Sequence, residues 1–180
     1  FTGLRIGVMT AKSLAFSREL PLFAAGSLEL LASRAAPHQD GAVLALMDAG
    51  RDALYVAAYE GFSEHLVPIR EPFRMPYSEL RTLATDLPRP LRVVPDGPRL
   101  LSRLAEGEGH ESIEGTLLNP AAPGGALAVG VSQGRSWCRQ VNPAELMPIY
   151  LGPSQAERVH GLDLSEEVHR PRPAQPDGGA

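Results

Sequence analysis

The chain opens with Phe1-Thr2-Gly3-Leu4-Arg5-Ile6-Gly7-Val8, and this stretch runs without a break into Met9-Thr10-Ala11-Lys12. The spacing of its apolar residues predicts a helix that extends to about Arg18. Apolar residues fall on two faces of this helix, and a helix that is apolar on two sides must be covered on two sides. The first face holds Leu4, Gly7, Val8, Ala11, Leu14 and Ala15, and we expect Leu4, Val8 and Ala11 to pack on the rest of the chain. The second face, expected to stay exposed and to form a partner interface, holds Ile6, Met9, Ser13 and Phe16.

This first helix lacks a residue that would normally cap its start. The first amides of a helix are usually satisfied by a Ser, Thr, Asp or Asn that precedes it. Only Phe1 stands before Thr2 here. We therefore expect the chain to be a fragment of a longer protein, truncated at its N-terminal side at the start of a helix.

The opening stretch also carries a resemblance to a known family. Residues Phe1 to Gly7 resemble the second half of the Gly-Pro-Gly-Ser-Phe-Thr-Gly-Leu-Arg-Ile-Gly signature of the TsaB family. These are bacterial proteins of tRNA threonylcarbamoyladenosine synthesis, often labelled glycoprotease-like. Further similar segments follow in the family's order: Pro21-Leu22, Gly26 to Ala32, Asp48-Ala49, Arg51, Tyr55 and Pro148 to Leu151. The sequence departs from the family's pattern at Gly50, Asp52, Ala53 and Gly152.

The resemblance implies a fold and a division of the chain. It implies an α/β fold with a mixed (α+β) sheet, of the actin-like, RNase H-like type. Residues 1–37 would be a remnant of the first actin-like subdomain, and residues 38–160 would form the second. Residues 161–180 are rich in Pro and Gly, a composition typical of a disordered tail.

The resemblance also implies a function and partners. The family's role is that of a non-catalytic scaffold required for threonylcarbamoylation of the tRNA adenosine beside the anticodon, in the cytoplasm. The implied partner is a TsaD-like catalytic subunit. A TsaE-like ATPase and a homodimer through the opening helix are further implied options.

The apolar pattern of the middle of the chain predicts a mixed sheet without reference to any family. Residues 42–47 form a continuous apolar run, as in a strand buried on both faces, and residues 53–59 are expected to pair with them antiparallel. Pro68 restricts residues 66–69 to an edge strand. Further expected elements are a short strand at 20–25 with few neighbours, a helix at 28–36 capped by Ser27, helices at 77–87 and 98–106, a strand at 91–94, and a weak helix at 121–137.

Charge and composition exclude several classes of protein. The net charge is −4, and the 17 basic residues are scattered rather than clustered, so no strong direct binding of nucleic acid is expected. Cys138 is the single cysteine, which rules out an internal disulfide. No apolar run has the length of a membrane span, so no membrane association is expected.

Neither a metal centre nor a catalytic residue is predicted by the sequence. No two of the five histidines have the three- or four-residue spacing that places two ligands on one face of a helix, and there is no phosphate-binding loop of the P-loop type. We therefore expect no cofactor and no catalytic activity. Asp48 could be a metal-binding carboxylate at a strand end, but a turn Asp that bonds its own following amides is the favoured interpretation. Arg5 is a candidate for contact with a phosphate or with a partner.

Two alternatives to a scaffold remain open at this point. One is an enzyme with an actin-like fold, either a residual ATPase or a glycoprotease-type metallopeptidase, which would need a metal-ligand pair or a phosphate loop. The other is a remnant that does not fold alone.

Overall fold

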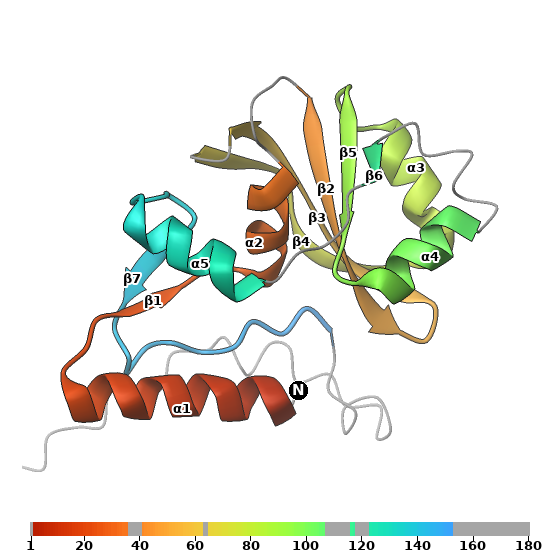
Figure 1. The fold of residues 1–180 in the computed structure, drawn as a ribbon. Coiled ribbons are helices and arrows are strands. Elements are labelled where there is room, and N and C mark those ends of the chain that lie inside the picture. The colour runs from red at the N-terminus through yellow and green to blue at the C-terminus, as the bar shows by residue number, and fades with distance from the viewer. Residues whose placement is uncertain (1, 36–40, 63–64, 107–115, 118–122, 153–180) are drawn as a thin grey trace, which may run out of the picture. The chain divides into compact units, whose positions relative to one another are not determined.

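The computed structural model describes residues 2–35, 41–62, 65–106, 116–117 and 123–152 (Figure 1). The chain divides into two compact units, Phe1–Ile149 and Tyr150–Ala180, and all helices and strands of the described residues belong to the first. In chain order the elements are α1 (Thr2–Arg18), β1 (Leu22–Ala24), α2 (Ser27–Ala35), β2 (Ala42–Gly50), β3 (Ala53–Phe62), β4 (His65–Pro76), the 3-10 helix η1 (Tyr77–Glu79), α3 (Leu80–Thr85), β5 (Leu91–Pro95), α4 (Pro98–Glu106), β6 (Thr116–Leu117), α5 (Pro123–Ser132) and β7 (Arg139–Val141). The expected tail at 161–180 lies outside the described residues.

A five-stranded mixed sheet forms the larger part of the fold, with strand order β4-β3-β2-β5-β6 (Figure 1). β2, β3 and β4 pair antiparallel, whereas β2, β5 and β6 pair parallel. The predicted α/β class and the predicted antiparallel pair are confirmed. β4 is an edge strand, as Pro68 indicated, but it extends to Pro76, well beyond the expected end at residue 69.

The core lies on both faces of β2, the central strand. Alternate residues Ala42, Leu44 and Leu46 join a buried cluster with side chains of β3, β5, α3 and α4. Val43 and Ala45 point to the opposite face of the sheet because successive side chains alternate, and α2 packs on the sheet there. A strand buried on both faces needs apolar residues at every position, which explains the unbroken run that the sequence shows.

A second, two-stranded sheet joins distant parts of the chain. β1 pairs antiparallel with β7, with Leu22 opposite Val141 and Ala24 opposite Arg139. From the sequence, the strand at 20–25 was expected to have few neighbouring strands. Its pairing with β7 was not predicted. A strand of three residues is too short to show an alternating pattern of apolar residues, so the sequence of neither strand could predict this pairing.

The start of α2 differs from the expectation of a Ser27 cap. The amide N–H of Leu30 donates to the carbonyl oxygen of Gly26 (2.8 Å), which makes Gly26 the cap residue. Glu29 Oε2 accepts the amide N–H of Gly26 (3.2 Å). This back-bond from the third helical residue is half of a capping box, and the hydroxyl of Ser27 is not needed for it.

The other helices follow the predicted positions closely. α4 has the predicted bounds, Pro98–Glu106. The segment from Tyr77 begins as a 3-10 turn before α3, and α5 ends at Ser132, before Gly134 with its positive φ of 61°. Within the described ranges, none of the helices combines the length and the apolar character that crossing a membrane requires.

Candidate partner-binding surface

One side of α1 is attached to the rest of the first unit. Ala15 is buried, with 6% of its surface exposed, and Val8 and Ala11 are partly buried. Lys12 Nζ donates hydrogen bonds to the carbonyl oxygens of Ala144 (3.3 Å) and Leu146 (3.1 Å). This attachment explains why the segment after β7 runs beside α1 in Figure 1.

The prediction that Leu4 packs on the rest of the chain is wrong. Leu4 is 48% exposed, and Leu14, which lies on the same predicted apolar face, is 57% exposed. Ala15, the buried residue of α1 in the described part of the chain, lies near the C-terminal end of the helix. Leu4 lies three turns earlier, beyond this buried contact, and Leu14 lies at the margin of the inner face and turns outward.

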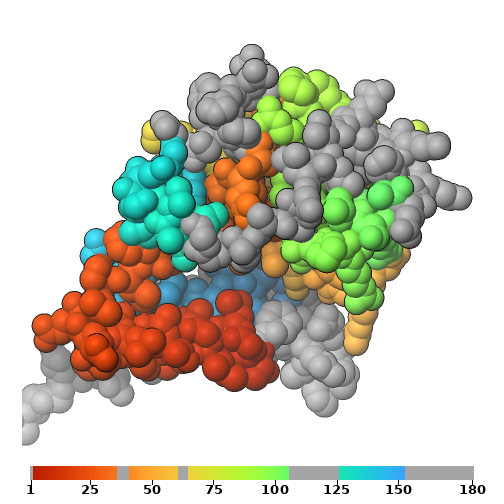
Figure 2. All heavy atoms as spheres, in the orientation of Figure 1, coloured from red at the N-terminus to blue at the C-terminus, as the bar shows by residue number. Residues whose placement is uncertain are grey.

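The outward side of α1 exposes large apolar side chains. The exposed fractions are 63% for Ile6, 58% for Met9 and 84% for Phe16, and Ser13 is exposed as well. Figure 2 shows the side chains of α1 at the molecular surface. The four residues that the sequence predicted for a partner interface therefore lie on one open face, although their role in binding stays a prediction.

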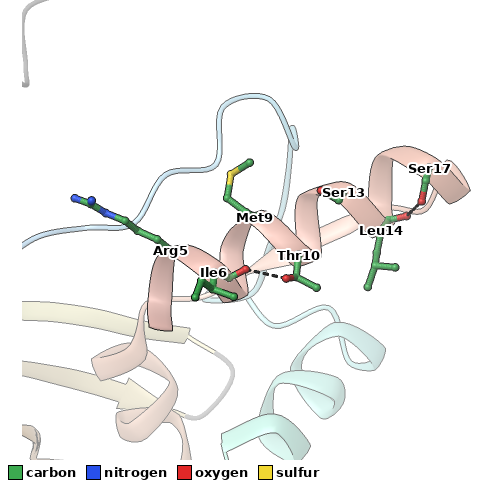
Figure 3. Close-up of a pocket in the computed structure, with 7 residues that line it drawn as sticks. All are labelled: Arg5, Ile6, Met9, Thr10, Ser13, Leu14 and Ser17. Atoms are coloured by element: carbon green, nitrogen blue, oxygen red, sulfur yellow. Dashed lines mark hydrogen bonds between the residues drawn. The ribbon is translucent and has the colours of Figure 1, made fainter. Parts of the chain in front are cut away.

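A shallow, open groove runs along this face (Figure 3). Among the described residues it is lined by Arg5, Ile6, Met9, Thr10, Ser13, Leu14 and Ser17. We call this strip, together with the adjacent Phe16, the outward face of α1. Sequence analysis missed Thr10, Leu14 and Ser17 as part of this face. Four-residue steps along the helix, from Ile6 through Thr10 to Leu14 and from Met9 through Ser13 to Ser17, are the signal that would have found them.

Two hydroxyl groups of the outward face are paired within the helix. Thr10 Oγ1 donates to the carbonyl oxygen of Ile6 (2.9 Å), and Ser17 Oγ donates to that of Leu14 (3.2 Å), as the dashed lines in Figure 3 show. Both hydroxyl groups are thus satisfied within the helix itself. Because an unsatisfied buried hydroxyl would oppose association, this arrangement favours contact with another apolar surface.

Arg5 lies at one end of the groove, in the first turns of α1. Its side chain is exposed. A guanidinium group there can meet a carboxylate or a phosphate of a bound partner. The predicted role of Arg5 as a phosphate or partner contact stays a prediction.

Asp48, the other candidate from the sequence, takes part in a turn. Asp48 Oδ1 accepts the amide N–H of Gly50 (2.7 Å), as the favoured interpretation held. The amide N–H of Asp48 donates to Asp96 Oδ2 (3.2 Å). Burial raises the pKa of the Asp96 carboxyl group, and the nearby charge of Asp48 adds to this effect. In the part of the chain that the structure describes, no group of three or more His, Cys, Asp or Glu side chains is arranged to hold a metal ion.

Glu29 connects α2 to the two-stranded sheet. Besides accepting the amide N–H of Gly26, its Oε2 forms an ion pair with Arg139 Nη2 of β7 at 3.2 Å. The buried Tyr59 lies in the field of this carboxylate, and burial together with Glu29 raises the pKa of the Tyr59 hydroxyl well above its usual range. The sequence could not predict this ion pair, because nothing local links residue 29 to residue 139.

Comparison with known families identifies the chain. Residues 1–107, more than half of it, match the family model described as "TsaD: tRNA N6-adenosine threonylcarbamoyltransferase". The chain belongs to this family. The curated "tRNA threonylcarbamoyladenosine biosynthesis protein TsaB" of Bacillus subtilis (strain 168) is 42% identical over 71 residues, which are 38% of this chain and 31% of that protein. The match thus spans about a third of the relative's length, and the TsaB-family resemblance inferred from the sequence is confirmed.

Solved structures show the same fold for this TsaB-family chain. "YeaZ from Pseudomonas aeruginosa" superposes with a TM-score of 0.54 at 21% identity, over 84% of this chain and 68% of that one. A protein described as having similarity to peptidase YEAZ from Pseudomonas aeruginosa superposes with a TM-score of 0.53 at 19% identity, with the same coverage. At this identity the likeness concerns the fold alone, and it confirms the predicted actin-like class.

Proposed function

We propose that this chain is a non-catalytic scaffold of the TsaB type that binds a TsaD-like catalytic subunit through the outward face of α1. In this role it supports threonylcarbamoylation of the tRNA adenosine beside the anticodon. The cytoplasmic location and the division of the chain at residues 1–37, 38–160 and 161–180 are part of this proposal. A TsaE-like ATPase and a second copy of this chain are the other partners that the family resemblance suggests.

One observation supports the choice of surface: from Ile6 to Ser17 the outward face of α1 carries no charged side chain, because Lys12 lies on the inner side of the helix and donates to the carbonyl oxygen of Leu146. The exposed side of a helix normally carries polar and charged residues. Here it carries Ile6, Met9, Leu14 and Phe16. Contiguous exposed apolar side chains of this kind mark sites of protein–protein contact.

The size of these side chains sets the expected binding energy. Burying a large apolar side chain completely contributes about 1.5–3 kcal/mol. Ile6, Met9 and Phe16 expose 63%, 58% and 84% of their surface, so each has most of this contribution still to gain. Three such side chains give on the order of 3–6 kcal/mol before the entropic cost of association, enough for a specific contact when other residues add to it.

The test is a binding titration with the TsaD-like subunit encoded by the same organism. The double variant Ile6→Asp/Met9→Asp should bind at least ~100-fold more weakly than the wild-type chain, since it loses apolar burial and must desolvate two carboxylates. Val67→Asp is the matched control, because Val67 is 51% exposed on the edge strand β4, away from α1. This variant should bind like the wild type.

The same proteins allow a functional measurement. Addition of the wild-type chain should increase formation of threonylcarbamoyladenosine by the TsaD-like subunit, whereas the Ile6→Asp/Met9→Asp variant should not. Undiminished binding or stimulation by this variant would show that the outward face of α1 is not the contact surface.

A further inference from the structure

The five-stranded sheet ends on one side in the long strand β4. This edge strand spans His65–Pro76, whereas β6, the last strand on the other side, is described over two residues. An edge strand has unpaired N–H and C=O groups to which a strand of another molecule can add. The side chains of Val67 and Phe73 on β4 are 51% and 36% exposed. A long edge that also exposes apolar side chains favours association of sheets edge to edge.

Three prolines interrupt β4 at intervals of four residues: Pro68, Pro72 and Pro76. Proline has no amide N–H, so within a sheet it is tolerated where that group would face away from the neighbouring strand. Whether these prolines block the free edge depends on the side of β4 that each missing N–H would face.

The missing N–H of Pro76 falls on the free edge. The amide N–H of Tyr77 donates to the carbonyl oxygen of Asp52 (2.9 Å), so the donor of residue 77 points toward the chain of β3. Opposed residues of an antiparallel pair alternate between those that exchange backbone hydrogen bonds and those that do not. The next pair, Pro76 opposite Ala53, is therefore of the kind without such bonds, and position 76 faces outward.

The missing N–H of Pro68 falls on the same edge. Pro68 lies opposite Tyr59, and Tyr59 is six residues from Ala53 along β3. Because this number is even, the pair of Pro68 with Tyr59 is of the same kind as the pair of Pro76 with Ala53. Two positions where a regular edge strand would offer a donor to a further strand thus have none.

The pairing between these two prolines is irregular. While β3 advances from Val56 to Ala58, β4 advances by three residues, from Phe73 to Arg70, and a second shift of register follows directly. β4 therefore carries extra residues, as in β-bulges, which bend a strand and increase its twist. Pro72 lies within the first irregular stretch. A straight strand of another molecule pairs poorly with an edge of this shape.

We infer that Pro68 and Pro76 close the free edge of β4 to strand addition, so that neither an extended peptide nor a second copy of this chain continues the sheet there. Strand addition takes its affinity from main-chain hydrogen bonds, and the two prolines remove donors on both sides of the irregular stretch. The inference is independent of the proposed function, because it concerns a surface other than the outward face of α1.

Restoring the two donors tests the inference. In the variant Pro68→Thr/Pro76→Thr both positions regain an outward N–H, and Thr is favoured in strands. Each added hydrogen bond strengthens association about 2- to 12-fold. The variant should therefore associate through β4 at least ~5-fold more strongly than the wild type.

Amide hydrogen exchange, measured from micromolar to millimolar protein concentration, localises this association. Leu66 and Arg74, opposite Gly61 and Tyr55, also direct their N–H groups outward by the same alternation. Exchange of these two amides should not depend on concentration in the wild type, even with an added peptide of the β3 sequence. In the variant it should slow at least ~5-fold as the concentration rises. Association through α1 would leave both amides unchanged.

Pro88→Thr is the matched control, because Pro88 is an exposed proline in the segment between α3 and β5, outside the sheet. It should behave like the wild type. Concentration-dependent protection of Leu66 or Arg74 in the wild type would overturn the inference, and so would its absence in a folded Pro68→Thr/Pro76→Thr variant. Circular dichroism establishes folding, and the single variant Pro68→Thr provides the same comparison where the double variant does not fold.

Discussion

Gly41→Ala is expected to destabilise the chain strongly, because the backbone of Gly41 lies in close contact with Pro90 at the start of the β2–β5 pair. Its φ is +106°, in the region that L side chains rarely adopt. A Cβ atom added there would lie 2.7 Å from Pro90 N and 2.8 Å from Pro90 Cδ, and closer still to the Pro90 carbonyl oxygen. That oxygen accepts the amide N–H of Ala42 (3.0 Å), where the parallel ladder with Leu91 begins.

The magnitude has two parts. A residue with a side chain at positive φ costs about 1–2 kcal/mol, and displacing packed backbone atoms costs roughly 1–3 kcal/mol more. A lower entropy of the unfolded chain returns about 0.4–1 kcal/mol for a Gly-to-Ala change. The free energy of unfolding should therefore fall by about 2–4 kcal/mol.

Gly50→Ala provides the matched control. Gly50 also has a positive φ, +68°, but no atom lies within 4 Å of the position of an added Cβ. It should lose only the conformational part, about 0–1.5 kcal/mol. Urea unfolding of the two purified variants, followed by circular dichroism, measures the difference, which isolates the collision with Pro90. Two variants that agree within ~0.5 kcal/mol would refute the described contact between Gly41 and Pro90.

The two remaining predictions also concern stability. Gly130→Ala should destabilise the chain by roughly 1–3 kcal/mol, because the added Cβ would lie 2.8 Å from Cζ3 of the buried Trp137 ring and nearer still to its Cη2. The control Ala128→Gly measures the Gly–Ala difference in free energy of unfolding at an exposed site of α5. A Gly130→Ala variant that is more stable than the wild type would contradict the described packing of Gly130 against Trp137. Asp96→Asn should raise the urea midpoint at pH 7, since burial raises the pKa of Asp96 and its ionised form therefore opposes folding above that pKa. This gain should fade as the pH falls toward the ordinary value of 3.8, and a gain independent of pH would exclude ionisation as its cause.

The sequence predicted the elements whose signals are local. The apolar run at 42–47 marks a strand buried on both faces, and β2 has buried residues from Ala42 to Leu46. Pro98 begins α4, as its fixed φ and missing amide N–H allow at a first helical position. In each case the residues that determine the structure lie within the element itself.

Contacts between distant residues could not be predicted. β1 pairs with β7 across more than a hundred residues, and the ion pair between Glu29 and Arg139 accompanies this pairing. Both strands have three residues, too few for an alternating pattern. Leu4 was expected to pack on the rest of the chain because the helical spacing gives its angle on α1, but that spacing does not say which neighbours cover it.

The presentation of the outward face of α1 depends on these distant contacts. Ala15 and Lys12 hold the inner side of the helix, and Lys12 does so through carbonyl groups of residues 144 and 146. The strand that follows α1 is held by β7, and β7 is held in turn by the ion pair of Arg139 with Glu29. Because the segment from Arg139 to Leu146 fixes both the helix and the strand after it, the side of α1 that stays open is decided by residues more than 120 positions later. The amphipathic pattern of α1 supplies two apolar faces, and the segment from Arg139 to Leu146 determines which of them remains exposed.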